Sequence, residues 1–253
     1  MILAILQARY SSTRLPKKVL KPILGKPMLL HQIERLQHSK IIDNLVVATS
    51  DSSTDDPIEK VCLENNINVF RGNLENVLDR FYQCAKVYNP DYIVRLTGDC
   101  PLLDWEVVDQ AIGFFFDGNY DFVETSLKFP DGLDTEIMTM QALEKAWKQA
   151  ELPSEKEHVT QFIVNRPNEF HNGIIEPSED LTHMRWTVDE PEDFVFVEKI
   201  YQALFEKKPL FLTEDILDLL KKEPELAKIN NCFLRNEGLE KSLVEDQDYL
   251  KNV

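Results

Sequence analysis

A basic stretch near the start of the chain carries the residues best suited to bind phosphate. The first acidic residue is Glu34, and six cations precede it in a chain of net charge −16. Three of these cations, Arg9, Arg14 and Lys18, stand among small residues whose backbone N–H groups can approach phosphate oxygens. A cationic loop in an acidic protein predicts a small polyanionic ligand held at one point, although a solvated basic surface would have the same composition.

Two aspartates, far apart in the sequence, each follow a predicted strand directly. Asp99 ends the segment YIVRLTGD, and Asp189 ends RWTVD. Carboxylates are the protein ligands that Mg²⁺ prefers, usually one or two of them together with substrate phosphate oxygens and water. Each aspartate could also simply cap the helix that follows it. Their pairing with a basic loop favours a magnesium site at Asp99 and Asp189.

The second half of the chain offers candidates for binding a second, anionic substrate. Arg185 and His158 could supply a positive charge and hydrogen-bond donors, and Asp134 and Glu136 further polar contacts. The alternative for His158 is a histidine of a helix face or of the core. We predict these four residues to bind the acceptor.

Short apolar runs alternate with longer amphipathic ones, which predicts an α/β fold. The fold class expected is a Rossmann-like, doubly wound, mostly parallel sheet with a small subdomain for dimerisation and acceptor binding. The predicted strands are 1–7, 45–48, 68–70, 92–96, one near Phe122, and 185–188. The predicted helices are 27–38, 58–65, 77–88, 104–116, 140–150, 155–165 and 191–205. Residues 1–210 form the predicted main domain, with the subdomain at about 120–185, and 211–253 form a helical tail.

Other classes of protein fit the sequence poorly. Neither the GxGxxG dinucleotide fingerprint nor a Walker loop is present, and the strongly acidic balance argues against nucleic-acid binding. No apolar run is long enough to cross a bilayer, so we expect a cytoplasmic protein. The four cysteines are irregularly spaced and predict reduced thiols.

Several motifs, in order along the chain, resemble those of a known family. They are ARYSSTRLPKKVL, FRGNLENVLDRFY, RLTGDCPLLD, DGLDTEI, EHVT and RWTVDEPEDF. The chain resembles the cytidylyltransferases that make CMP-sugar acids, and most closely their branch of spore-coat polysaccharide biosynthesis proteins. The resemblance covers about residues 1–205 and implies a homodimer.

The resemblance also implies roles for individual residues. It makes Asp99 and Asp189 the metal ligands and, with Arg9 and Lys18, the catalytic residues. The nucleotide-binding residues that it implies are Gln7, Ala8, Arg9, Ser12, Arg14, Lys18, Arg80, Thr97 and Gly98. The chain departs from the family's pattern at Lys17, where a glycine is common, and at Thr97, where the enzymes that make CMP-Kdo carry an amide.

The sequence therefore predicts a Mg²⁺-dependent nucleotidyltransferase that uses CTP to activate a sugar acid or a phosphorylated small molecule for surface polysaccharide synthesis. Two alternatives stay open at this point. One is a glycosyltransferase that uses a nucleotide-sugar, although such enzymes usually carry a DxD motif. The other is a nucleotide-binding module without catalytic activity.

Overall fold

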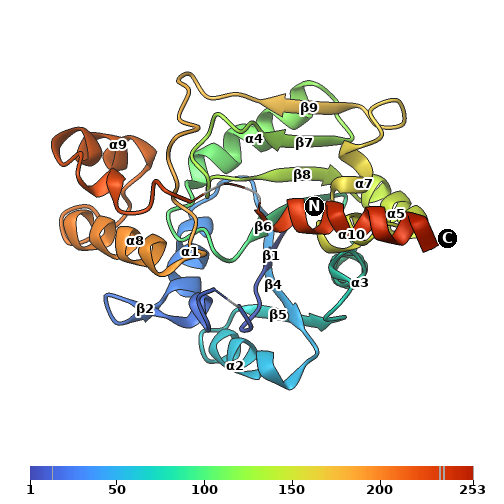
Figure 1. Cartoon of the computed structure of the whole chain (residues 1–253), viewed down its shortest axis with the longest axis horizontal. Coiled ribbons are helices and arrows are strands. Elements are labelled where there is room, and N and C mark those ends of the chain that lie inside the picture. The colour runs from blue at the N-terminus through green and yellow to red at the C-terminus, as the bar shows by residue number, and fades with distance from the viewer. Residues whose placement is uncertain (13, 234, 236, 253) are drawn as a thin grey trace.

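A seven-stranded, mostly parallel sheet forms the centre of the molecule in the computed structural model (Figure 1). The structure describes residues 1–12, 14–233, 235 and 237–252. The strand order is β5-β4-β1-β6-β8-β7-β9, and within it β8 runs antiparallel to both of its neighbours. The predicted fold class is confirmed.

The strands of this sheet are β1 (Ile2–Gln7), β4 (Asn44–Ser50), β5 (Asn68–Gly72), β6 (Tyr92–Thr97), β7 (Phe122–Thr125), β8 (Glu136–Thr139) and β9 (Asn172–Ile175). A two-stranded ribbon consists of β2 (Pro22–Ile23) and β3 (Lys26–Pro27). The α-helices are α1 (Met28–Leu36), α2 (Asp56–Glu64), α3 (Val77–Tyr88), α4 (Trp105–Asp117), α5 (Met140–Gln149), α6 (Pro153–Glu157), α7 (Gln161–Val164), α8 (Pro191–Leu204), α9 (Thr213–Lys222) and α10 (Glu237–Asn252). Short 3₁₀ turns are η1 (Lys18–Leu20), η2 (Ser53–Asp55) and η3 (Leu226–Lys228).

Strand β1 shows how the sequence builds a core on each face of the sheet. Successive side chains of a strand point to opposite faces. Ala4 and Leu6 accordingly join a cluster with α1, α4, α8 and α9, whereas Leu3 and Ile5 join one with α3, α5 and α7. Helices therefore cover both faces, which is why β1 is apolar at almost every position.

Two of the predicted elements are wrong in the structure. The predicted helix 155–165 is divided into α6 and α7, because Val159 adopts a φ of 56° that no α-helix accommodates. The predicted strand 185–188 joins no ladder and forms one bridge, between Arg185 and Asp131. This extended segment crosses the end of the sheet and bonds to two different loops, so it has no single partner strand. Strand β8, which forms the antiparallel step of the sheet, was not predicted.

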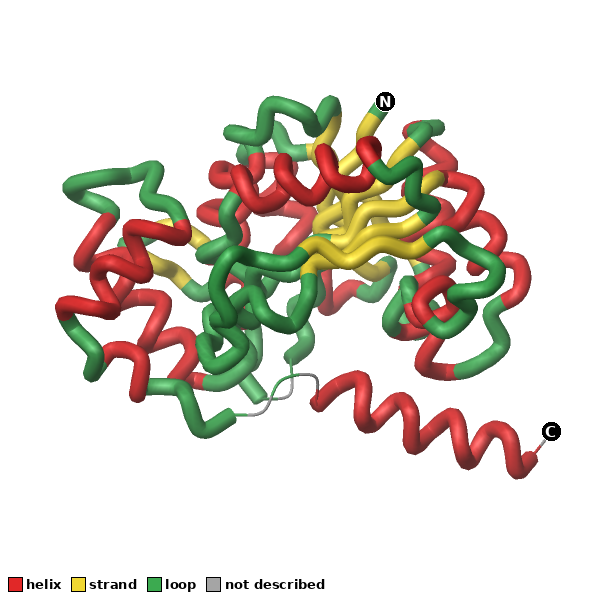
Figure 2. The backbone as a smooth tube through the Cα atoms, turned by 90° about the horizontal axis from the view of Figure 1, so that it is seen from above, coloured by secondary structure: helices red, strands yellow, loops and turns green. Residues whose placement is uncertain are grey.

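The segment predicted as a tail divides into two parts that differ in their packing. The apolar face of α9 is buried in the main core through Ile216, Leu217, Leu219 and Leu220. Helix α10 lies at the front of the molecule as seen in Figure 1, which is the lower edge in Figure 2, and packs against α6, where Ser242 and Asp246 are buried. Throughout the described ranges, every helix is too short or too polar to span a membrane.

Candidate functional site

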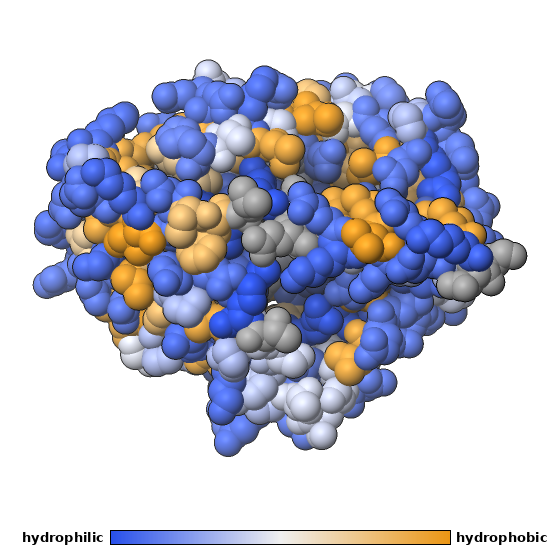
Figure 3. Space-filling model, viewed as in Figure 1, coloured by the Kyte–Doolittle hydropathy of each residue, from blue (hydrophilic) through white to orange (hydrophobic). Residues whose placement is uncertain are grey.

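A cavity of about 650 Å³ opens at the carboxyl ends of β1 and β6, where parallel sheets bind ligands. We call it the nucleotide cavity. It is lined by Gln7, Ala8, Arg9, Ser11, Ser12, Arg14, Lys18, Val19, Arg95, Thr97, Gly98, Asp99, Glu157, His158, Asp189, Gly238 and Lys241. Figure 3 shows hydrophilic residues gathered around the hollow at the centre of this face.

Lys18 brings the two predicted metal ligands together. Its Nζ donates to Asp99 Oδ2 over 2.8 Å and to Asp189 Oδ1 over 2.7 Å. Burial opposes ionisation of Lys18 and Asp99, but the attraction between the ammonium and the carboxylates around it is larger. It lowers the pKa of Asp99 to about 2 and raises the pKa of Lys18 above its ordinary value. The basic loop and both aspartates therefore share one pocket.

Backbone contacts explain why two distant aspartates meet. The amide of Val188 donates to the carbonyl of Asp99 over 2.8 Å, which joins the two segments directly. The fully buried carboxylate of Asp193, in the first turn of α8, accepts the amides of Asp189 and Glu190, each over 2.9 Å. Asp193 thus fixes the backbone that presents Asp189, a role that the sequence did not reveal.

The donor set at this point suits Mg²⁺. Two carboxylates converge on one cation, here the ammonium of Lys18, and hard oxygen ligands of this kind hold Mg²⁺ together with phosphate oxygens. Within the part of the chain that the structure describes, no cluster of three or more potential ligand side chains occurs. A metal here would need oxygens from its substrate to complete its coordination.

The two loop arginines lie on opposite sides of the cavity and are both paired. Arg14 contacts Asp189 over 2.9 Å and Glu190 over 2.7 Å. Arg9 Nη2 donates to Glu157 Oε1 of α6 over 3.0 Å. A nucleotide that entered would exchange these carboxylate contacts for phosphate contacts.

Asp55 fixes the start of the basic loop, a role that no sequence motif signals. It is fully buried and accepts hydrogen bonds from the amide of Tyr10 and from Thr49 and Ser50. Burial alone would raise the pKa of Asp55, but these bonds outweigh it and keep the pKa below the ordinary value. An ionised Asp55 therefore holds the loop against the end of β4.

The ends of β1 and β6 pack too closely for larger residues. A Cβ on Gly98 would lie 2.9 Å from the carbonyl oxygen of Gln7 and 3.1 Å from Ala8 Cβ. The amide of Ala8 donates to the carbonyl of Ala48, so it is already satisfied and does not point at a phosphate. Gln7 lines the cavity with a buried Oε1 that has no partner among the described residues. Ser12 also lines the cavity.

Arg80 lies outside the nucleotide cavity, contrary to the role predicted for it. Its side chain is fully buried beside β5 and donates to the carbonyl of Asn73 over 2.6 Å. Burial, with Arg9 nearby, lowers the pKa of Arg80 to about 10. Because α3 turns this side chain toward the sheet, Arg80 supports the fold around the loop.

The departure at Lys17 has a structural counterpart. Lys17 adopts the left-handed conformation, with φ 63° and ψ 20°, just before η1. Glycine takes this conformation without strain, whereas a residue with a side chain does so at a cost. The glycine common at this position in the resembling family would fit this turn.

A second cavity of about 380 Å³ adjoins the first and shares Arg14, Arg95, Thr97, Asp99, His158, Asp189 and Gly238 with it. We call it the acceptor cavity. Its other lining residues are Cys100, Glu124, Thr125, Leu127, Asp131, Asp134, Glu136, Thr160, Gln161, Arg185, Thr187 and Leu239. All four predicted acceptor-binding residues, Asp134, Glu136, His158 and Arg185, line it.

The predicted cations of the acceptor cavity are engaged within the protein. Arg185 pairs through two nitrogens with Asp193 and through a third with Asp131, each over 2.9 Å. Burial, with Arg95 adding to it, lowers the pKa of His158 to about 4, so its ring is neutral near pH 7. His158 and Arg185 are thus poor partners for an acceptor's negative charge, which the sequence had assigned to them.

Carboxylates dominate this cavity instead. Glu136 pairs with Arg95 over 2.5 Å and accepts from Thr160 over 3.0 Å. The side chain of Glu124, on β7, forms no hydrogen bond or ion pair with any residue in the described ranges. Burial, with Glu136 and Asp134 adding to it, raises the pKa of Glu124 to about 7. The cavity offers acceptor atoms to a ligand that carries hydrogen-bond donors.

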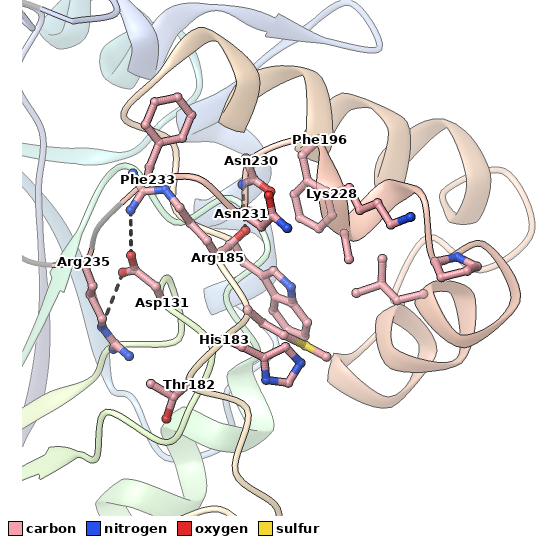
Figure 4. A pocket seen from close by; sticks show the side chains of 15 residues that line it. Asp131, Thr182, His183, Arg185, Phe196, Lys228, Asn230, Asn231, Phe233 and Arg235 are labelled. Carbon is pink, nitrogen blue, oxygen red and sulfur yellow. Dashed lines mark hydrogen bonds and ion pairs between the residues drawn. The ribbon is translucent and has the colours of Figure 1, made fainter.

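A third cavity, of about 600 Å³ (Figure 4), adjoins the acceptor cavity. Asp131 and Arg185 line both and form the wall between them. In Figure 4 Asp131 lies between Arg185 and Arg235, and apolar side chains such as Phe196 form the far wall. Burial, with Asp134 adding to it, raises the pKa of Asp131 to about 7 in spite of both arginines.

Comparison with known proteins assigns this architecture to one family. A model of the cytidylyltransferase family matches residues 3–238. An uncharacterized protein of Methanocaldococcus jannaschii is 39% identical over 91% of this chain and 94% of its own length. A spore coat polysaccharide biosynthesis protein of Bacillus subtilis is 36% identical over 89% of this chain and 96% of its own. The solved structure of a cytidylyltransferase from Leptospira borgpetersenii superposes with a TM-score of 0.86 at 32% identity, covering 92% of this chain and 99% of that one.

Proposed function

Because this chain belongs to the cytidylyltransferase family, we propose that it transfers the CMP group of CTP to a sugar acid and releases pyrophosphate, with Mg²⁺ as cofactor. The observation that carries the proposal is the convergence of Lys18, Asp99 and Asp189 at the mouth of one cavity. We place the reaction in the cytoplasm and assign it to surface polysaccharide synthesis, as in the spore coat relative. The homodimer implied by the resemblance is part of the same proposal.

The residues of the nucleotide cavity would divide the work by charge. Mg²⁺ would be held by Asp99 and Asp189 and would neutralise phosphate charge. Lys18 would leave Asp99 and Asp189, and Arg14 would leave Asp189, and both would then bind phosphate oxygens. Arg9 would bind phosphate oxygens as well. An acceptor oxygen attacks the α-phosphate in line, the bond to the β-phosphate breaks, and pyrophosphate leaves. Positioning and charge neutralisation supply most of the rate in such transfers.

The acceptor cavity favours a polyhydroxylated acid over a simple phosphorylated molecule. Glu124 has no protein partner in the described chain, and Asp134 and Glu136 lie near it. Carboxylates accept hydrogen bonds from hydroxyl or amine groups but repel a phosphate dianion. The acceptor's single carboxylate would lie toward Arg14 and Arg95, which line both cavities.

A pyrophosphate-release assay tests this function directly. The purified protein is incubated with each of four ribonucleoside triphosphates, with and without Mg²⁺, against a panel of sugar acids and sugar phosphates. We expect release with CTP, Mg²⁺ and a sugar acid. Consumption of a nucleotide-sugar without pyrophosphate would instead establish a glycosyltransferase. CTP binding without turnover on any acceptor would indicate a module that only binds the nucleotide.

A further inference from the structure

Helix α10 begins where the match to the family model ends, at residue 238, and it borders the nucleotide cavity. Figures 1 and 2 agree that this helix lies in front of the body, with its first turn toward the middle of the molecule. The first turn supplies Gly238 and Lys241 to the nucleotide cavity and Leu239 to the acceptor cavity. A helix that lies almost wholly beyond the matched residues thus forms part of the site.

Two hydrogen-bonded positions fasten α10 against the short helix α6. The carboxylate of Asp246 accepts the amide of Ser154 over 2.9 Å and its hydroxyl over 2.5 Å. Four residues earlier on α10, Ser242 Oγ lies 3.0 Å from Nε2 of His158, which is four residues later than Ser154. Both pairs use the one-turn spacing of a helix, so the two helices lie antiparallel. Ser242 and Asp246 are both more than nine-tenths buried.

This attachment fixes the direction in which the first turn of α10 faces. Gly238 and Lys241 lie one turn apart, next to the buried Ser242, and so they face the cavity. Lys241 forms no hydrogen bond or ion pair with any residue of the described chain. The neighbouring His158 is neutral near pH 7, because burial lowers its pKa to about 4. The ammonium of Lys241 is therefore available to a ligand.

We propose that Lys241 is a phosphate-binding residue of the nucleotide cavity and that α10, fastened to α6 by Ser242 and Asp246, positions it. The proposal rests on the proposed function, because it takes the ligand to be a nucleoside triphosphate. Arg9, Arg14 and Lys18 approach the same cavity from the loop after β1 and are paired with carboxylates. Lys241 comes from α10 and adds a cation whose binding to phosphate breaks no ion pair within the described chain.

The test measures binding by titration calorimetry with three probes: CTP, inorganic triphosphate and cytidine. In Lys241→Ala we expect the Kd values of CTP and of inorganic triphosphate to rise about 10-fold, as for loss of one partly exposed phosphate contact. Cytidine carries no phosphate, so its Kd should not change. The Lys241→Arg variant should restore most of the affinity, and the loss should shrink as NaCl is added. Lys251→Ala is the matched control, because Lys251 lies at the other end of α10, exposed and paired with Asp248.

The attachment of the helix is tested by a double-mutant cycle. Asp246→Ala removes the contact to α6 and should weaken triphosphate binding about as much as Lys241→Ala does, while the combined variant should be no weaker. Unchanged triphosphate binding in Lys241→Ala, or an equal loss for cytidine, would overturn the proposal. A wild-type protein that binds inorganic triphosphate but not CTP would overturn the proposed function. The Kd of inorganic triphosphate in Lys241→Ala would then still test the role of Lys241. Binding of neither probe would overturn both.

Discussion

The nucleotide cavity and the acceptor cavity adjoin each other, yet they hold their charges in different ways. In the nucleotide cavity cations and carboxylates meet directly, as Lys18 does with Asp99 and Asp189. In the acceptor cavity Arg185 is likewise paired with carboxylates, but two acids, Glu124 and Asp131, have pKa values raised to about 7 by burial. The nucleotide cavity thus holds directly paired charges, whereas two acids of the acceptor cavity are partly protonated at neutral pH.

This difference indicates which kind of ligand each cavity favours. A metal–triphosphate complex carries charges of both signs, so it can replace every ion pair of the nucleotide cavity with another one. A ligand of the acceptor cavity meets acids that are costly to ionise, and hydroxyl or amine donors reduce that cost. The predictions that follow test this division, beginning with the largest effect.

Asp99→Asn should give the largest loss, because it removes a predicted metal ligand and leaves Lys18 with one carboxylate. We expect kcat to fall by about 10³-fold or more, the upper range for loss of one electrostatic group at a reacting phosphate. The measurement is pyrophosphate release at saturating CTP and Mg²⁺, with thermal unfolding to check the fold. Asp218→Asn, at an exposed surface position, is the control. Near-normal turnover in Asp99→Asn would contradict the role given to the paired charges of the nucleotide cavity.

Glu136→Gln should act mainly on the acceptor side, because Glu136 lines the acceptor cavity and not the nucleotide cavity. It keeps the shape of the side chain and its bond from Thr160 but removes the negative charge that compensates Arg95. Hydrogen bonds to charged groups contribute about 1.5–3 kcal/mol, so we expect the KM for the acceptor to rise about 10- to 100-fold. The KM for CTP should stay within a factor of about two, which is less than the change expected for the loss of one hydrogen bond. A larger change in the KM for CTP would show that the two cavities do not act separately.

The sequence sufficed for the parts of the molecule that local patterns specify. Helix α3 occupies 77–88 as predicted, and Asp104 caps α4 by accepting the amide of Glu106. Asp99 could be expected at the edge of the sheet, because it follows the carboxyl end of β6. Asp189 lies beside it although the strand predicted before Asp189 joins no ladder. The roles of Asp55 and Asp193 stayed hidden, since each acts by accepting backbone amides of the loops that carry the site, which the residue type does not signal.

Burial decided most of what the sequence could not show. Arg80 stands in a motif of the resembling family, yet its helix turns it into the core. Arg185 and His158 were assigned to an anion by residue type, but the first is bound by Asp193 and Asp131 and the second is neutral. Lys241 sits in an ordinary amphipathic helix, and its position in the cavity depends on a contact between two helices far apart in the chain.

The raised pKa of Glu124 predicts that stability depends on pH. In the unfolded chain a glutamate ionises near pH 4.5, whereas in the folded protein Glu124 does so near pH 7. Between these values the folded state binds more protons, so the free energy of unfolding should fall as pH rises from 4.5 to 7 and level off above. In Glu124→Gln the fall in the free energy of unfolding between pH 4.5 and 7 should be smaller by about 1 kcal/mol, a value that allows for screening by solvent. Denaturant titrations of both proteins at several pH values measure the difference. If the free energy of unfolding depends on pH in the same way in both proteins, the pKa of Glu124 is not raised by folding.

Lys17→Gly should have the smallest effect, and it acts on the backbone of the nucleotide side instead of its charges. Lys17 has a φ of 63°, which strains a residue with a side chain and suits glycine. Relief of this strain, less the greater freedom of glycine in the unfolded chain, should stabilise the protein by about 0.5 kcal/mol. Thermal unfolding should shift upward by about 1–2 °C for a chain of this size. Lys40→Gly, at an exposed position whose φ is not positive, should shift it downward. If Lys17→Gly also loses stability, the contact of the Lys17 side chain with the Tyr10 ring contributes more than the left-handed backbone costs.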